Sequence, residues 1–432
     1  MKQLRKVIIL ALACIVVGQM LLTNSSCKKM EVFDPEVYDT ILTIASPVDQ
    51  VDETHDWIMS RERPYVITAD ANVNAKKLQI LTEDPLKSND AVVVSEAPIS
   101  DGDFVTLYGS SPLIKEKLYA ALIDDKGAYT VTEFAANEIN VNFANPLYVR
   151  QFLSYVPQPQ EYVFGYEAEF PEPGDYDYND VVLHISKEWV SSNAIRLNVT
   201  LAAVDSKIQL AAAMRLIGYN FDDIDSVKTV GGITFNDNVP GQILMVVNKD
   251  VDQLLVRGRN NEAVINLFAD AHWATGDNLV ENFGVIKRKG YNVTKGSDSN
   301  NQVIVPRTIS YLIYFKDGSR LNEFTLDSLD PFIMLAYHGP VWEVHLNEYR
   351  AAQTLFEYSV VDLKNAHLPW ALKVPTGQYR HPLKGVNIGF YIKDSKSLYG
   401  AYSKLGHAFG TWSSDKTKAA DWYLFPNENS VF

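Results

Sequence analysis

Cysteine is almost absent from this chain of 432 residues, which contains only Cys14 and Cys27. Cys14 lies in an apolar run close to the N-terminus, where an export leader would be removed. If the leader ends before Cys27, the remaining chain has a single thiol and forms no internal disulfide. An exported fold of this kind depends on its hydrophobic core and on any bound metal for its stability.

Long apolar runs are also scarce. The run over 7–17 follows a basic segment and is too short to span a membrane comfortably, and no second long run occurs. This order is typical of a secretory signal. Small polar residues then lead through Ser26 to Cys27, which resembles a bacterial lipoprotein signal, although Asn24 replaces the usual aliphatic residue. We therefore predict a lipoprotein signal peptide over 1–26 and lipidation, including palmitate, at Cys27. A plain secretory signal with an incidental cysteine is the alternative.

Positive charge is in deficit. The chain has 39 Lys and Arg against 53 Asp and Glu, a formal net charge of −14. Removal of the predicted leader deletes Lys2, Arg5 and Lys6 and no acid, which makes the charge −17. Nucleic-acid binding is excluded as a function, because phosphate contacts need clustered basic residues. A negative surface suits cation binding and solubility outside the cell.

Recognisable catalytic motifs are missing. The sequence has no His-Glu-x-x-His zinc motif, no Gly-x-Ser-x-Gly elbow, no phosphate-binding loop and no dinucleotide fingerprint. His338 and His345 have no base motif beside them, and we interpret them as ordinary histidines rather than as a zinc site. A lipidated Cys27 is no nucleophile. We predict that the protein is not an enzyme and assign no catalytic residue.

Short apolar segments with turn residues between them recur along the chain, and the 23 Tyr and 19 Phe favour strands. We expect a mainly β fold with two β-sandwich-like domains and few short helices. The predicted order is a tether over 27–55, an N-terminal sandwich over 56–156 and a second β domain over 160–432. Strands are expected at 65–68, 78–81, 91–94, 104–108, 117–122, 129–132, 161–170, 179–185, 195–201, 208–217, 243–247, 264–268, 309–315 and 332–337.

An acidic turn is the sharpest local feature of the sequence. Asp175, Asp177 and Asn179 alternate with tyrosines, and Asp180 follows at once. Hard cations such as Ca²⁺ bind six to eight oxygens from closely spaced carboxylates, amides and carbonyls. The turn resembles the start of an EF-hand loop but lacks its glycine and its final glutamate. An exposed turn capped by its own Asp and Asn side chains is the alternative.

Two more acids precede this turn. In a strand over 161–170, Glu167 and Glu169 would lie on one face, and Tyr162, Phe164 and Tyr166 on the other. Adjacent unpaired carboxylates repel one another, and a cation removes that cost. We therefore predict a structural Ca²⁺ site whose ligands are Glu167, Glu169, Asp175, Asp177, Asn179 and Asp180.

The stretch FGYEAEFPEPGDYDYNDVVL resembles the signature of the LruC-type domain of bacterial surface lipoproteins. In outline, the resemblance extends over about residues 160–425. By position, Glu167, Asp175, Asp177, Asn179 and Asp180 match the acidic core of that family. Ala168 and Lys384 stand where the family has acids. The resemblance implies a cell-surface location and no particular activity.

Together these features predict a Gram-negative lipoprotein, anchored to the outer membrane and exposed at the surface, that acts as a Ca²⁺-stabilised binding or structural module. Its partner would be a glycan or an envelope or host protein, and its ligand-binding residues are not predicted. The alternatives are a polysaccharide hydrolase with paired carboxylates and a subunit of a fimbria-like polymer. Four aromatics near the C-terminus could stack on sugars, but we expect them in the core: Trp370, Trp412, Trp422 and Tyr423.

Overall fold

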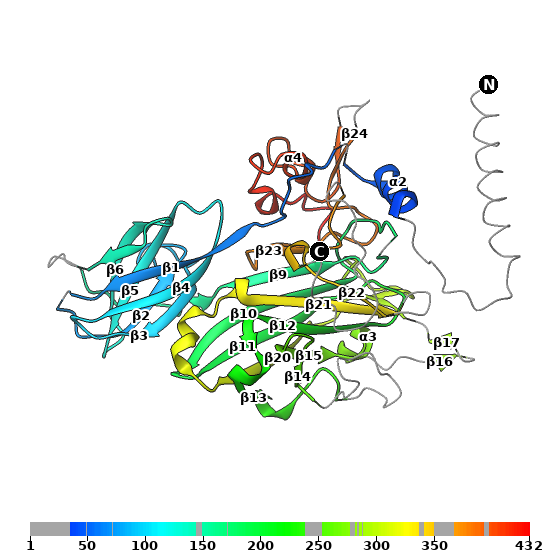
Figure 1. The fold of residues 1–432 in the computed structure, drawn as a ribbon. Coiled ribbons are helices and arrows are strands. Elements are labelled where there is room, and N and C mark those ends of the chain that lie inside the picture. Colours follow the sequence, from blue (N-terminus) through cyan, green and yellow to red (C-terminus); the bar gives the residue numbers. More distant parts are fainter. Residues whose placement is uncertain are drawn as a thin grey trace, which may run out of the picture.

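The protein is described by a computed structural model, and its mainly β architecture confirms the predicted fold class (Figure 1). The structure describes residues 35–48, 50–70, 72–143, 149–170, 172–237, 253–276, 281–282, 285–286, 288–336, 341–349, 367–392 and 397–432. The leader, Cys27, His338 and the strand predicted at 243–247 lie outside these residues. Within the described residues, no helix is long and apolar enough to cross a membrane.

The N-terminal sandwich consists of two sheets that enclose their own core, which includes Tyr65, Leu78 and Leu122. Its strands alternate buried and exposed side chains, as expected where one face of a sheet meets water. The smaller sheet has the order β4 (Phe104–Pro112), β1 (Ser60–Thr68), β7 (Asn140–Asn142). The larger has the order β6 (Tyr129–Ala135), β5 (Lys117–Asp124), β2 (Ala75–Leu81), β3 (Val92–Pro98), β8 (Gln158–Pro159).

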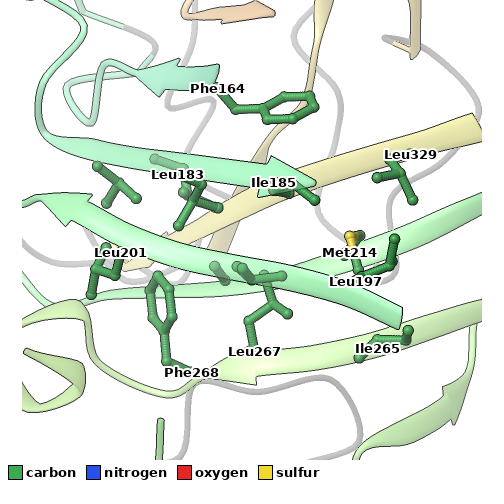
Figure 2. Close-up of a cluster of buried hydrophobic side chains, with 14 of the residues drawn as sticks. Phe164, Leu183, Ile185, Leu197, Leu201, Met214, Ile265, Leu267, Phe268 and Leu329 are labelled. Atoms are coloured by element: carbon green, nitrogen blue, oxygen red, sulfur yellow. The ribbon is translucent and has the colours of Figure 1, made fainter. Parts of the chain in front are cut away.

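The second sandwich is larger and contains the acidic turn. What we term the inner sheet has the order β13 (Ile224–Thr229), β20 (Arg307–Phe315), β11 (Ala194–Ala203), β10 (Val181–Ser191), β9 (Glu161–Tyr166), β23 (Ala371–Val374). The outer sheet has the order β14 (Leu255–Arg257), β15 (Glu262–Phe268), β12 (Leu210–Asn220), β21 (Leu329–Ala336), β22 (Val341–Val344). Figure 2 shows side chains such as Phe164, Ile185 and Leu267 filling the core that these two sheets enclose.

The remaining elements are short. Three two-stranded ribbons pair β16 (Glu281–Asn282) with β17 (Val285–Ile286), β18 (Gly290–Tyr291) with β19 (Asn301–Gln302), and β24 (Phe390–Ile392) with β25 (Ser397–Tyr399). The α-helices within the described residues are α2 (Pro35–Ala45), α3 (Ala271–Ala274) and α4 (Phe409–Ser414). Turns of 3₁₀-helix occur at Phe221–Asp223, Val230–Gly232, Gly318–Glu323, Leu326–Ser328, Asn347–Tyr349 and Trp422–Leu424.

Most of the chain after β23 forms a cap, defined here as residues 375–392 and 397–432, on the other face of the inner sheet. Val163, Val182 and Leu372 point from that face into a second core shared with the cap. The four C-terminal aromatics are buried, as predicted: Trp370, Trp412, Trp422 and Tyr423. The cap therefore covers the second face of the inner sheet at β9 and β23, whose side chains are nearly all buried, whereas β11 and β20 alternate buried and partly exposed side chains.

The prediction of a tether over 27–55 is corrected by the structure. The described part of this segment folds onto the second domain. Helix α2 places Leu42 in the core between the two sheets. Val48 and Val51 join the core under the cap, together with Trp57 and Met59 from the region assigned to the first sandwich. A polar segment with two prolines suggests a linker, but these widely spaced apolar residues find a core only in three dimensions.

His345 lies in a buried charged cluster on β21 and just beyond β22. Its Nδ1 is 2.8 Å from an Asp330 carboxylate oxygen, and its Nε2 is 2.9 Å from a Glu343 oxygen. Burial alone would lower the pKa of His345, but the charges of Asp330 and Glu343 outweigh it and raise that pKa to about 9. Because the folded-state pKa is raised, the stabilisation is complete below the unfolded value of 6.5 and is lost as the pH rises through about 9.

We predict that His345→Gln lowers the melting temperature most at about pH 6 and progressively less as the pH passes about 9. The reason is that wild-type His345 loses its charge over this interval, and Asp330 then keeps, among the described residues, only its ion pair with Arg215. Melting temperatures of the wild type and the variant across that range measure the effect. A difference that does not change with pH would show that His345 is uncharged in the folded protein.

Candidate metal centre

The acidic turn connects β9 to β10 and lies where the inner sheet meets the cap. Tyr176 and Tyr178 hold it in place, because both rings are buried in the core under the cap. Both residues have positive φ values, 57° and 51°, which are unusual for residues other than glycine. Such strain costs on the order of 1–3 kcal/mol per residue and persists only where the surroundings enforce it. Each strained tyrosine turns the backbone, so that the neighbouring Asp175, Asp177 and Asn179 can face away from the core that holds the tyrosine rings.

The predicted strand over 161–170 ends early, at Tyr166, which is a second correction. Its first half alternates as predicted, with Tyr162, Phe164 and Tyr166 in the core between the sheets and Val163 on the other face. Beyond Tyr166, the Ala168 amide donates to Asp180 Oδ2 at 2.7 Å, a side-chain acceptor in place of a strand partner. Glu167 and Glu169 therefore belong to the turn region and not to the face of a strand.

The fold brings the predicted ligands into two groups. Carboxylate oxygens of Glu167, Asp175 and Asp177 lie within 4.8 Å of one another, and so do those of Glu167, Glu169 and Asp180. Glu167 is the residue that belongs to both groups. Asp175 and Glu169 are exposed, whereas the other three acids and Asn179 are buried. The structure thus places five predicted acids together, with Asn179 in the same turn.

Backbone amides orient this cluster. The Tyr178 amide donates to Glu167 Oε1 at 2.6 Å, and the Asn179 amide donates to Asp177 Oδ1 at 3.2 Å. The second oxygen of Glu167 and the side-chain oxygen of Asn179 are buried without a hydrogen-bond partner. Orphaned buried oxygens are costly, and a bound ion is one of the few explanations for them. These residues therefore fit a hard cation that oxygen ligands bind.

Electrostatics support the same conclusion. Burial raises the pKa of Glu167 well above its ordinary value, and the charges of Asp177 and Asp180 raise it further. The pKa of Asp177 is raised by burial and by Asp175, and that of Asp180 by burial and by Glu169. Carboxylates in this situation are stable only with a proton or a cation beside them. A divalent cation bound here would supply that charge.

Two residues that sequence reasoning did not assign to the site also line it. Asp205 follows β11 and borders a pocket of about 310 Å³ together with Glu169, Asp175 and Asp180. Lys384 of the cap reaches the same pocket and forms an ion pair with Asp205. Asp205 is 25 residues beyond Asp180, and no local spacing signals its role; the pairing of β10 with β11 brings it to the turn.

Gly174 provides a steric test of this geometry. A Cβ atom at this position would overlap Glu167 Oε2 and lie 3.1 Å from Glu169 Oε2. We predict that Gly174→Ala destabilises the protein by about 1–3 kcal/mol, a fall in melting temperature of roughly 2–10 °C in EGTA. Gly296→Ala is the matched control, since a Cβ there meets no atom within 4 Å. Equal melting temperatures for the two variants would show that Gly174 does not hold Glu167 closely.

The fold and the site together define a mainly β protein with two sandwiches and an acidic, all-oxygen candidate metal centre at the edge of the second. The family model described as "Domain of unknown function (DUF4842)" matches residues 193–423, more than half of the chain, and the protein belongs to that family. The match begins after the acidic turn and includes Asp205 and most of the cap. It carries no assigned activity.

Other comparisons add little. No curated protein matches the sequence. Among solved structures, the chain is similar to one described as a "Putative lipoprotein from Bacteroides ovatus", with 14% sequence identity over 83% of this chain and 99% of that chain and a TM-score of 0.47. This likeness is too distant to support an argument about function.

Proposed function

We propose that this protein is a lipid-anchored protein of the outer membrane, exposed at the cell surface, whose second domain is a non-enzymatic binding or structural module stabilised by Ca²⁺. The observation that carries the calcium proposal is the buried, unpartnered Glu167 oxygen inside a cluster of carboxylates. The anchor proposal rests on the leader and Cys27. The LruC-type affinity rests on the acidic motif, alongside the DUF4842 family membership.

Calcium suits this donor set better than other common ions. Neither of the two groups of acids includes a His or Cys residue, which disfavours zinc and copper. Two ligand oxygens on opposite sides of a Ca²⁺ ion are about 4.6–5.2 Å apart, since each bond is about 2.3–2.6 Å. The oxygens of each group lie within 4.8 Å of one another, close enough for one ion of this size to contact all three. Mg²⁺ needs shorter bonds and usually keeps several waters.

The role we propose for the ion is to join the cap to the inner sheet. Asp177 Oδ2 accepts the Gly385 amide at 2.9 Å, and Asn179 Nδ2 donates to the Pro382 carbonyl at 3.0 Å. The Ile388 amide donates to the Tyr176 carbonyl at 2.7 Å. Three residues of the turn thus hold the cap directly. Without a cation, repulsion among the acids works against these contacts.

A non-enzymatic role is supported by what the centre resembles. Close carboxylates whose backbone is fixed by buried tyrosines suit a structural ion. The proposed partner is a glycan or an envelope or host protein, which the anchored domains would meet outside the cell.

We predict that Ca²⁺ raises the melting temperature of protein produced without residues 1–27, relative to EGTA. At a hundredfold excess over the dissociation constant the gain is about 2.7 kcal/mol. The double variant Asp175→Ala/Asp177→Ala should lose this gain, because it removes two of the proposed ligands. Asp125→Ala, an exposed acid of the N-terminal sandwich, should keep it. Coinciding melts for the wild type in Ca²⁺ and EGTA would contradict a structural calcium site.

We also predict that the full-length protein incorporates labelled palmitate in a Gram-negative host and fractionates with the outer membrane. Cys27→Ser should abolish both, because Cys27 supplies the thiol that carries the lipid. Cys14→Ser should keep both, since that cysteine lies within the predicted leader. Label retained in Cys27→Ser, or absent from the wild type, would contradict the anchor without bearing on the calcium proposal.

A further inference from the structure

The carboxylates around the acidic turn do not form one ring of ligands. They form two groups of three, Glu167 with Asp175 and Asp177, and Glu167 with Glu169 and Asp180, which have Glu167 alone in common. Asp175 and Asp177 lie within 4.8 Å of each other through their carboxylate oxygens, and so do Glu169 and Asp180. Glu167 therefore lies between two separate acid pairs, each of which with Glu167 offers three oxygens.

Glu167 is positioned as a bridge between the two pairs. Its side chain is fully buried, and Oε1 accepts the Tyr178 amide, which fixes the plane of the carboxylate. Oε2 is buried and has no hydrogen-bond partner. This second oxygen faces Gly174, whose missing side chain leaves room for it beside Glu169. A buried oxygen without a donor, enclosed by other carboxylates, points to a cation as its partner.

The charge of the site also indicates two ions. Besides the five acids of the two groups, the adjoining pocket is bordered by Asp205, and its two cationic side chains are Lys207 and Lys384. Six carboxylates and two ammonium groups leave four negative charges, which two divalent cations would neutralise and one would not. Uncompensated charge is most costly here, because three of these acids are buried.

We propose that the acidic turn binds two Ca²⁺ ions, one held by Asp175 and Asp177 and the other by Glu169 and Asp180, with Glu167 shared between them. This inference rests on the calcium site proposed above and adds a second ion to it. Oxygens bridging two metal ions typically hold them about 3.5–4 Å apart, which one carboxylate between the two pairs allows. The exposed members, Asp175 and Glu169, place each ion at the edge of the site, where solvent supplies further ligands.

The decisive measurement is the number of bound Ca²⁺ ions. The full-length protein in mild detergent is titrated with Ca²⁺ by calorimetry, and native mass spectrometry counts the ions. The titration extends to about 10 mM, above the millimolar dissociation constants of the weakest extracellular calcium modules. We expect two equivalents for the wild type, and likewise for the control Asp125→Asn.

Conservative variants separate the two ions. Asp175→Asn and Glu169→Gln change exposed members of different groups, so both should fold, and each should retain one equivalent and weaken the other about tenfold or more. Glu167→Gln should weaken both equivalents, because it changes the shared ligand. Melting in EGTA checks that each variant is folded.

The outcomes distinguish the two-ion centre from the single calcium site proposed above. One equivalent in the wild type, weakened alike by Asp175→Asn and Glu169→Gln, would overturn the two-ion centre and leave the single calcium site intact. Two equivalents that both persist at full affinity in Glu167→Gln would also overturn it, by removing the shared ligand. No bound Ca²⁺ in the folded wild type would overturn both proposals.

Discussion

Burial of β9 and β23 on both faces of the inner sheet is the constraint on which the acidic turn and the cap depend. Phe164 and its neighbours on one face pack against the outer sheet, while Val163 and Leu372 on the other face pack under the cap. A turn between two central strands of such a sheet has little access to water. Three acids at the β9–β10 turn, Glu167, Asp177 and Asp180, are consequently buried, and their charge is costly unless a proton or a cation neutralises it.

Residue types alternate along the turn, and this alternation holds the acids in place. Tyr176 and Tyr178 supply the apolar surface that anchors the backbone, and their strained conformations are enforced by packing under the cap. Asp175, Asp177 and Asn179, which alternate with them, carry oxygens. The Tyr178 hydroxyl donates to the Pro369 carbonyl at 2.8 Å, so the anchoring ring is itself satisfied. The buried tyrosines and the candidate ligands are therefore direct neighbours in the chain, and this arrangement is expected of a rigid site for a hard cation.

The same packing joins parts of the chain that are far apart in sequence. Trp57 lies against Trp412, with ring centroids 5.4 Å apart, and Lys384 pairs with Asp205. The segment leading from the predicted anchor is thus attached to the second domain, and the cap is attached to the acidic turn. A change in the conformation of the turn would therefore alter the position of the cap, because the turn supplies three of the hydrogen bonds that hold the cap.

The sequence by itself determined the mainly β class, most strand positions and the acids of the turn. These features are local: alternation of period two, and carboxylates spaced two residues apart, arise from neighbours in the chain. It also indicated that the C-terminal tryptophans are core, since large aromatics rarely remain exposed.

Only the tertiary structure decided which residues meet. The early end of β9, the packing of Val48 and Trp57 under the cap, and the arrival of Asp205 at the site all follow from long-range pairing. The division of the acids into two groups around Glu167 is likewise a matter of turn geometry, in which strained tyrosines redirect the backbone. Residue spacing could show that the acids are close in the chain, but only burial and backbone direction decide which oxygens converge and which remain unpaired.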